Sequence, residues 1–124
     1  MANVVVWADI PVLDIDRARA FYAHVLGSPV EYMPGTTEVA ILKSPGETDP
    51  MDVSADLALS QSTPSTTHGT TIYLGAMGDI DGMVARAVEA GGSILAEKAF
   101  MDMVGWIAFI QDSEGNRIGI HQPT

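Results

Sequence analysis

Three polar residues of this chain have types and spacing that suggest chemistry. Asp9 lies in an alternating segment, on the face opposite its continuous row of apolar side chains. Asp56 lies in a second alternating segment, and His121 follows Asp56 by 65 positions in a third. Carboxylates and an imidazole on one face can bind a polar ligand, act as general bases, or bind a metal ion at low affinity. The alternative is that all three are solvated groups at strand ends, and the sequence leaves that choice open.

Aromatic residues in alternating segments form a second set of candidates. Trp7 lies two residues before Asp9 and therefore shares its face. Tyr73 and Trp106 can project from their strands in the same way, although the apolar neighbours of Trp106 fit a core position equally well. An aromatic ring in a concave site provides stacking and attraction for cations, worth about 0.5–2 kcal/mol.

A strand followed by a capped helix must position Trp7 and Asp9. The apolar face of residues 4–12 predicts a strand that packs on the helix after it. Asp14 is a typical N-cap, and Gly27 is a typical helix stop. Between them, apolar residues recur at helical spacing and predict one buried face: Ile15, Ala18, Phe21, Tyr22, Val25 and Leu26.

The same signals recur in the second half of the chain. Asp14-Ile-Asp16 returns as Asp79-Ile-Asp81, and the shift of 65 positions also carries Gly27 onto Gly92. Each half then reads as a strand, an Asp-capped helix, a glycine stop and three strands. We therefore predict an α+β protein built from two βαβββ modules.

The boundaries of the modules follow from this repeat. One domain spans residues 1–124, with module one at about 1–60, a Ser/Thr-rich linker at 61–68 and module two at about 69–124. Residues 112–116 predict a tight hairpin turn that uses Gly115. Beyond the first strand, we expect strands at residues 29–33, 38–43, 52–60, 70–76, 93–100, 104–111 and 116–121.

Composition excludes several classes of function. The 124 residues include 6 basic and 16 acidic side chains, and the net charge of -10 would repel nucleic acid and anionic membranes. The same charge suits neutral or cationic ligands, although it also keeps a protein soluble. The absence of cysteine excludes a disulfide framework and a thiolate metal site. We expect no signal peptide or membrane span, and we predict the cytoplasm as the compartment.

Two motifs give the chain a family resemblance. Residues 10–22 (IPVLDIDRARAFY) with residues 25–27 (VLG), and residues 112–121 (DSEGNRIGIH), resemble the vicinal oxygen chelate superfamily of glyoxalase I, bleomycin resistance proteins and extradiol dioxygenases. More narrowly, the chain is similar to bacterial proteins related to lactoylglutathione lyase. The resemblance covers essentially the whole chain. It implies two modules whose sheets join into an eight-stranded open cup, usually in a dimer.

The resemblance also assigns positions for the four metal ligands found in that family's metalloenzymes. The first falls on Trp7 and the last on Gly119, whose counterpart 65 residues earlier is Ser54. The remaining position falls on Ile72 by the same shift, or on Thr71 if the second module has one extra residue before its helix. None of these residues is a histidine or a carboxylate, the groups that such ions need. We therefore expect the usual metal site to be absent and predict no cofactor.

The expected function is that of a metal-free cup protein that binds a small organic molecule, by analogy with bleomycin resistance proteins. One alternative is a metal-dependent lyase or isomerase of glyoxalase I type with shifted ligands. Another is a metal-free enzyme with Asp9 or His121 as general base, so enzymatic activity stays an open question. We expect a homodimer, because two four-stranded sheets leave edges to cover. The predicted ligand contacts are Trp7, Asp9, Ser54, Asp56, Thr71, Tyr73, Trp106, Gly119 and His121.

Overall fold

The chain folds as two successive modules with the same order of elements. The computed structural model describes residues 7–46, 55–59 and 66–123. The first module consists of β1 (Ala8–Val12), α1 (Ile15–Leu26), β2 (Glu31–Tyr32), β3 (Val39–Leu42) and β4 (Ala55–Leu59). The second consists of β5 (Ile72–Gly75), α2 (Ile80–Glu89), β6 (Ser93–Met101), β7 (Gly105–Gln111) and β8 (Arg117–Gln122). The predicted α+β fold of two βαβββ modules is confirmed, while Ser54 and residues 61–65 of the predicted linker lie outside the described residues.

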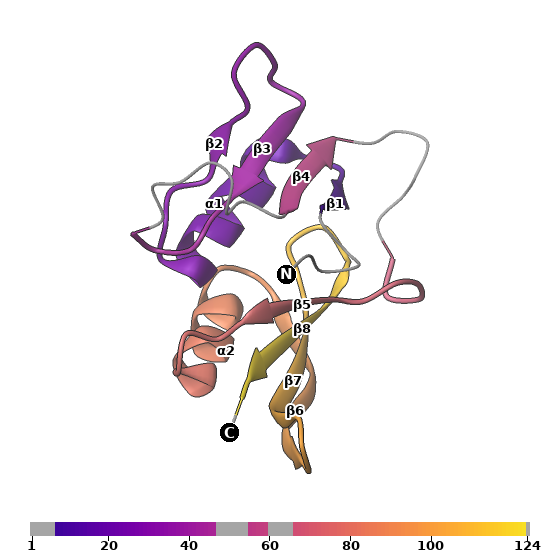
Figure 1. The fold of residues 1–124 in the computed structure, drawn as a ribbon. Helices are drawn as coiled ribbons and strands as arrows, with labels where there is room; N and C mark the ends of the chain where they lie inside the picture. Colours follow the sequence, from indigo (N-terminus) through magenta and orange to yellow (C-terminus); the bar gives the residue numbers. More distant parts are fainter. Residues whose placement is uncertain (1–6, 47–54, 60–65, 124) are drawn as a thin grey trace.

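Each module forms one four-stranded sheet, and the two sheets share a topology (Figure 1). The strand order is β1-β4-β3-β2 in sheet A and β5-β8-β7-β6 in sheet B. In both sheets the first and last strands of the module pair in parallel, and the other pairs are antiparallel. No strand pair joins the two sheets within the described ranges, so the predicted cup is open and not closed into a barrel.

Local capping signals explain why α1 begins and ends where it does. The side chain of Asp14 accepts a hydrogen bond from the backbone N–H of Arg17 at 3.1 Å. Gly27 adopts a left-handed conformation with φ of 69° and donates its N–H to the carbonyl of Ala23 at 2.9 Å. The six apolar residues predicted to face the core are all buried.

The second helix repeats the N-cap but differs at its C-terminus. The Asp79 carboxylate accepts from the backbone N–H of Gly82 at 3.0 Å. The glycine with positive φ after this helix is Gly91, at 103°, and not Gly92 as the shift of 65 indicated. The repeat is therefore real at the level of elements but is not constant in length.

The connection before α2 is longer than the one before α1. Two residues separate β1 from α1, whereas four separate β5 from α2. Met77 and Gly78 in the longer connection both have positive φ, at 55° and 79°. Buried Val12 lies two residues before its N-cap, whereas buried Ala76 lies three residues before its own. A shift of 64 therefore relates the first strands of the two modules.

Strand alternation gives each sheet one face toward its helix and one open face. In sheet A, Ile10 and Leu57 are register partners, and both are buried in the core with α1. Their neighbours Asp9 and Asp56 are also register partners and therefore project from the opposite, open face. These two positions place charge on the face that the helix does not cover.

The modules contact one another through their helices and through a turn. Arg86 Nε of α2 donates to the carbonyl of Val25 at 3.3 Å, and the side chains of His24 and Glu89 lie 3.4 Å apart. Figure 1 shows the β7–β8 turn, in yellow, reaching from sheet B toward β1. Within the described ranges, no helix is long and apolar enough to cross a membrane.

Candidate functional site

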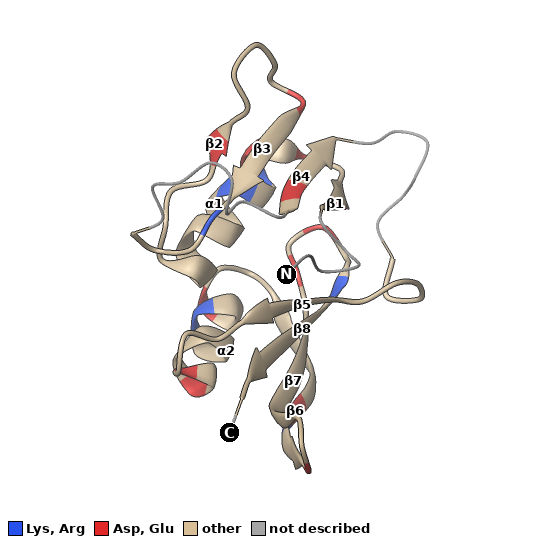
Figure 2. Cartoon of the chain, viewed as in Figure 1, with Lys and Arg blue, Asp and Glu red and all other residues tan. Residues whose placement is uncertain are grey.

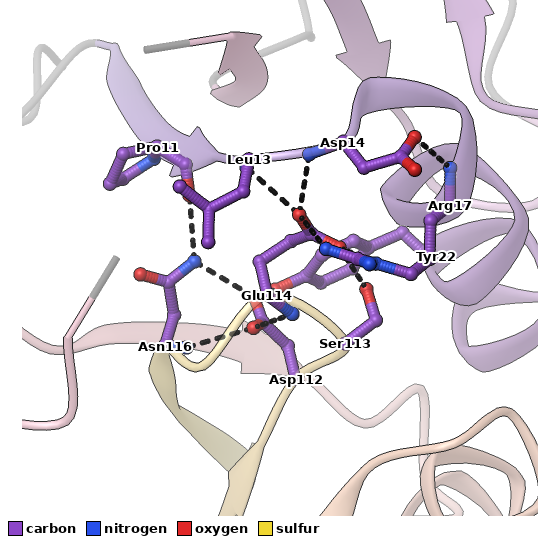
Figure 3. A network of polar contacts seen from close by, with 9 residues as sticks. All are labelled: Pro11, Leu13, Asp14, Arg17, Tyr22, Asp112, Ser113, Glu114 and Asn116. Carbon is purple, nitrogen blue, oxygen red and sulfur yellow. Dashed lines mark hydrogen bonds and ion pairs between the residues drawn. The ribbon is translucent and has the colours of Figure 1, made fainter. Parts of the chain in front are cut away.

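The β7–β8 turn docks the second module on the first (Figure 3). Glu114 Oε1 accepts hydrogen bonds from the backbone N–H groups of Leu13 and Asp14, at 2.8 and 2.7 Å. Its Oε2 accepts from Arg17 Nε at 2.7 Å, and the Glu114 side chain is fully buried. Burial alone would raise the pKa of Glu114, but the Arg17 bond and the backbone donors hold that pKa below its ordinary value. The turn is thereby fixed to the start of α1.

Asp112 organises the same turn from the inside. The Tyr22 hydroxyl of α1 donates to Asp112 Oδ2, and Asn116 Nδ2 donates to the same oxygen at 3.0 Å. Asn116 Nδ2 also lies 2.8 Å from the carbonyl of Pro11, which ties the start of β8 to the edge of β1. Burial raises the pKa of Tyr22, so its hydroxyl remains a donor. These contacts fix sheet B against β1 and define the seam between the modules.

Two carboxylates lie beside this seam, on the open face of sheet A. Asp9 and Asp56 are register partners in the parallel β1–β4 pair, so their side chains are neighbours on one face. The indole Nε1 of Trp7 lies 3.2 Å from Asp9 Oδ1 and 3.1 Å from Asp56 Oδ2. One N–H donor is therefore shared between two carboxylates. The structure thus brings together three of the residues singled out by alternation.

Asp56 is the less satisfied member of this carboxylate pair. Its residue is only 4% exposed, and its Oδ1 has no hydrogen-bond partner among the described residues. Within the same ranges, no Lys, Arg or His forms an ion pair with either aspartate. Burial first, and then the neighbouring Asp9, raise the pKa of Asp56 to about 7, although the Trp7 bond lowers it. The pair therefore exchanges a proton near neutral pH.

A cavity of about 230 Å³ lies in the seam next to Asp9. Asp9 from the first module and Arg117 from the second bring opposite charges to its walls. A mainly apolar lining with a few placed polar groups is typical of sites for small organic ligands. The remaining lining residues are Ile10, Pro11, Thr66, Thr70, Ile72, Asn116 and Ile118.

Arg117 is held in place by two contacts on the second module. Its Nη1 donates to Thr71 Oγ1 at 2.7 Å, and its guanidinium carbon lies 3.9 Å from the centroid of the Phe109 ring. Thr71 therefore lies on the Arg117 side of β5. Ile72 instead pairs with buried Ile118 and packs against the core. The extra residue before α2 thus favours Thr71 over Ile72 as the open-face position.

An aromatic ring covers the last strand at Gly119. Tyr73 is the register partner of Gly119, and a Cβ atom on residue 119 would overlap with the Tyr73 ring. The same ring makes an edge contact with Phe109 at a centroid distance of 5.8 Å and is 51% exposed. Residue 119 must therefore be a glycine for the Tyr73 ring to keep this position over β8.

The residues at the family's metal-ligand positions do not fit a divalent ion. Trp7 and Gly119 supply no ligand atom, and the Thr71 hydroxyl is already hydrogen-bonded. Tyr73 pairs with Gly119 as its counterpart Asp9 pairs with Asp56, so the position in module one that corresponds to Gly119 is Asp56. The constant shift of 65 indicated Ser54 instead, which lies outside the described residues. One carboxylate is too few oxygen ligands for such an ion. The described part of the chain has no cluster of three or more His, Cys, Asp or Glu suited to a metal.

Two further predicted ligand contacts, Trp106 and His121, lie elsewhere on sheet B, away from the carboxylate pair. Trp106 packs against the core and makes an edge contact with Phe100 at a centroid distance of 5.3 Å. It therefore lies on the helix-facing side of β7. His121 Nε2 lies 2.7 Å from the carbonyl of Val104, beside the turn between β6 and β7. No hydrogen bond or ion pair of the described residues joins His121 to the pair.

Sequence reasoning missed two residues that shape the site. Arg117 lies two positions before Gly119, so alternation could have placed it on the same face. Glu114 has no comparable local signal, because the backbone groups that it binds lie about 100 positions earlier in the chain.

Comparisons with known proteins agree with this architecture. The family model of the Glyoxalase/Bleomycin resistance protein/Dioxygenase superfamily matches residues 4–120. A search of curated proteins found no match. Among solved structures, a glyoxalase/bleomycin resistance protein from Albidiferax ferrireducens T118 is 20% identical with a TM-score of 0.75, over 98% of this chain and 100% of that one.

Two further structures share the fold at similar distance. TnmS3, an antibiotic binding protein from Streptomyces sp. CB03234, is 22% identical with a TM-score of 0.64, over 100% of this chain and 99% of that one. A glyoxalase-related enzyme from Fulvimarina pelagi is 17% identical with a TM-score of 0.69, over 94% of this chain and 86% of that one. At these identities the structures show a common fold only. Because the family model covers nearly the whole sequence, the chain belongs to the Glyoxalase/Bleomycin resistance protein/Dioxygenase superfamily.

Proposed function

We propose that this protein binds a small organic molecule in its open cup without the metal centre of the family's metalloenzymes. The observation that carries the proposal is the aromatic filling of two metal-ligand positions. Trp7 occupies the first position, and the ring of Tyr73 covers Gly119 at the last. Aromatic surfaces at these points are suited to stacking on a ligand.

The seam cavity supports this proposal with its mixture of groups. Apolar lining residues can bury the carbon skeleton of a ligand, while Asp9 and Arg117 can orient its polar ends. TnmS3, described as an antibiotic binding protein, has the same fold, which is consistent with an organic ligand in this architecture. We do not propose a metal-dependent lyase or isomerase, because the donor set at the family positions does not suit a divalent ion.

A second candidate function is a metal-free enzyme that uses acid–base chemistry. The observation that favours it is the pKa of Asp56, which burial and then the neighbouring Asp9 raise to about 7. A carboxyl group with a pKa near the working pH is suited to proton transfer. Asp9 is the exposed member of the pair and would meet the substrate first. His121 is a weaker candidate, because no contact joins it to the pair in the described ranges.

We also propose a homodimer. Strand β6 lies at an edge of sheet B and is exposed along its whole length, with large apolar side chains such as Leu95 and Phe100 in contact with solvent. An edge strand of this kind presents unpaired backbone groups with which a second chain can pair. The cytoplasmic compartment stays a prediction that rests on the expected lack of a signal peptide and of a membrane span.

Binding is tested by a thermal-shift screen of a library of small organic compounds, because a ligand of the native state raises its melting temperature. We expect hits that stabilise the wild type and lose their effect in Trp7→Ala. Trp106→Phe is the matched control, since Trp106 packs on the helix-facing side, and it should keep the shifts. Hits that stabilise all three proteins equally would contradict the proposed site. Elemental analysis that finds near one equivalent of zinc, nickel, iron or manganese after purification without chelator would contradict the proposal that the protein works without a metal.

A further inference from the structure

We propose that Asp9, Asp56 and Trp7 form a subsite that receives a cationic nitrogen group of an organic ligand, such as an ammonium or an amidinium. The inference rests on the proposed function, because it names the chemical group that the cup recognises. Its three residues come from β1, the residue before it, and β4, and they converge on one face of sheet A.

A shortage of hydrogen-bond donors is the first argument. Ionised carboxylates are acceptors only, with two oxygens each, and the Trp7 N–H is shared between the two groups. Asp56 Oδ1 accepts no hydrogen bond in the described part of the chain, although the residue is buried. A buried acceptor without a donor loses its hydrogen bonds to water and gains none in return, which destabilises the protein until a ligand supplies a donor. An ammonium group carries three N–H donors and can supply both the missing bond and the opposite charge.

The geometry gives such a group a route to the pair. Asp9 is exposed and lines the seam cavity, while Asp56 lies beside it in the next strand. A ligand whose carbon skeleton occupies the cavity can therefore present its nitrogen to Asp9 first. Trp7 is 41% exposed next to the same carboxylates, so its indole ring is available for cation–π attraction.

The charged groups around the pair favour a cation. On sheet A, β3 places Ile41 beside Asp56, and β2 places Glu31 in the same row, so the other charged residue in this row is acidic. Figure 2 shows this acidic colouring on β2 and β4. Across the cavity, the guanidinium of Arg117 is engaged with its own module and does not form an ion pair with Asp9. A guanidinium carries five N–H donors, and those of Arg117 not bonded to Thr71 can meet an anionic or polar end of the ligand.

An organic cation fits the subsite better than a metal ion. Hard divalent ions take six or more oxygen ligands, and two carboxylates with an N–H donor aimed at both do not approach that number. In the described ranges no third metal-ligating side chain completes a cluster here. A nitrogen cation needs only acceptors and an aromatic surface, which are the groups present.

Binding of a cation must compete with a proton on the pair. Because the pKa of Asp56 is raised, the pair carries a proton at lower pH, and an arriving ammonium displaces that proton to solvent. Affinity for a permanently charged ligand should therefore rise with pH through the neutral range. Among the described charged groups, Glu31 lies in the same row of sheet A, Lys43 lies two residues beyond Ile41 at the end of β3, and Arg117 lies across the cavity.

The test compares 2-phenylethylammonium with its neutral isostere 2-phenylethanol. Binding is followed by the fluorescence of Trp7 in a Trp106→Phe background, where it is the only tryptophan. At about pH 8.5 we expect the ammonium compound to bind about ten-fold more tightly than the alcohol, as charge-assisted hydrogen bonds imply. Asp56→Asn and Asp9→Asn should abolish that preference, whereas Glu31→Gln, which removes the same charge from the same row, should keep it. At about pH 5.5 the preference should shrink, because the pair then holds a proton.

The outcomes separate this inference from the proposed function. Equal affinity for the two compounds would overturn the cation subsite and leave organic-ligand binding in the cup intact. An ammonium preference that survives Asp56→Asn would also overturn it, by placing the recognition elsewhere. Failure of both compounds to bind would overturn the subsite, and the thermal-shift screen would then decide the proposed function separately. Tight binding of Ca²⁺ or Mn²⁺ that is lost in Asp56→Asn would replace the organic cation with a metal ion.

Discussion

Glu114 and Asp56 are both buried carboxylates, yet the molecule treats them in opposite ways. Glu114 accepts two backbone N–H groups, the guanidinium of Arg17 and the hydroxyl of Ser113. Asp56 shares one indole N–H with another carboxylate, and one of its oxygens has no partner in the described chain. The pKa of Glu114 is accordingly lowered, whereas the pKa of Asp56 is raised.

The difference shows which carboxylate holds the fold together and which is free to bind. Each hydrogen bond to a buried charge stabilises the native state, so Glu114 fastens sheet B to the start of α1. Asp56 gains little from its surroundings and instead costs stability when it is ionised. A ligand can supply to Asp56 what the protein supplies to Glu114. Mutations at the two sites should therefore move stability and binding in different directions.

Removal of Glu114 should have the largest effect on stability. Glu114→Ala leaves two backbone donors and Arg17 without their acceptor, and we expect a loss of about 3 kcal/mol in the free energy of unfolding. Urea denaturation measures it. Asp81→Asn is the control, because its ion pair with Lys98 lies at the surface and should be worth about 0–1 kcal/mol. Equal losses in the two variants would show that the turn does not fasten the modules.

Replacement of Asp56 should change the pH dependence of stability. Its pKa is about 7 in the folded protein against 3.8 ordinarily, so between these values the native state holds a proton that the unfolded state has lost. Stability from this group therefore falls as pH rises from about 4 to about 7 and is flat above that range. We expect Asp56→Asn to be about 1–2 kcal/mol more stable than the wild type at pH 8, after allowance for solvent screening. Denaturation series at several pH values check this. A wild-type curve parallel to that of Asp56→Asn would contradict the raised pKa.

A methyl group at position 119, beneath the Tyr73 ring, should destabilise the protein less than the loss of Glu114 does. Gly119→Ala introduces a Cβ that overlaps with the Tyr73 ring. Because that ring is half exposed, it can swing outward, and we expect a loss of about 1 kcal/mol. Denaturation of the single variant and of Gly119→Ala combined with Tyr73→Ala tests the cause. The alanine at 119 should cost much less in the double variant, and an unchanged cost would mean that overlap with the Tyr73 ring is not responsible.

Removal of the Trp7 donor should shift a pKa with little effect on the fold. The Trp7 hydrogen bond lowers the pKa of Asp56 against the larger effect of burial. Trp7→Phe keeps an aromatic ring but loses the N–H, so the pKa of Asp56 should rise further. Stability at low pH should stay within about 1 kcal/mol of the wild type, because Trp7 is partly exposed. NMR titration of the Asp56 carboxyl group in this variant measures the shift, and a lower pKa would contradict the shared hydrogen bond.

The sequence predicted the elements of the fold well, because the signals for them are local. Asp14 and Gly27 bound α1 where expected, since an N-cap and a left-handed glycine act within a few residues. Alternation also placed Trp7 and Asp9 on the open face. These conclusions needed no knowledge of which strands are neighbours.

The site was harder to predict, because it depends on register and on distant contacts. The shift of 65 grouped Asp56 with His121, but the parallel β1–β4 register places Asp56 beside Asp9. An extra residue before α2, with Met77 at positive φ, breaks the constant shift between the first strands. Glu114 could not be found, since its partners lie in the other module.

The pKa of the Asp56 carboxyl group shows most directly whether the carboxylate pair has free capacity for a cation. A carbon-detected NMR titration of aspartate-labelled protein follows each carboxyl signal, and the Asp56→Asn variant assigns the Asp56 signal by its absence. We expect a midpoint of about 7 for Asp56, well above its ordinary 3.8. Addition of 2-phenylethylammonium should lower that midpoint, because a bound cation favours the ionised pair. A midpoint near 3.8, unmoved by the ammonium compound, would show that the pair is satisfied within the protein and has no free capacity for a cation.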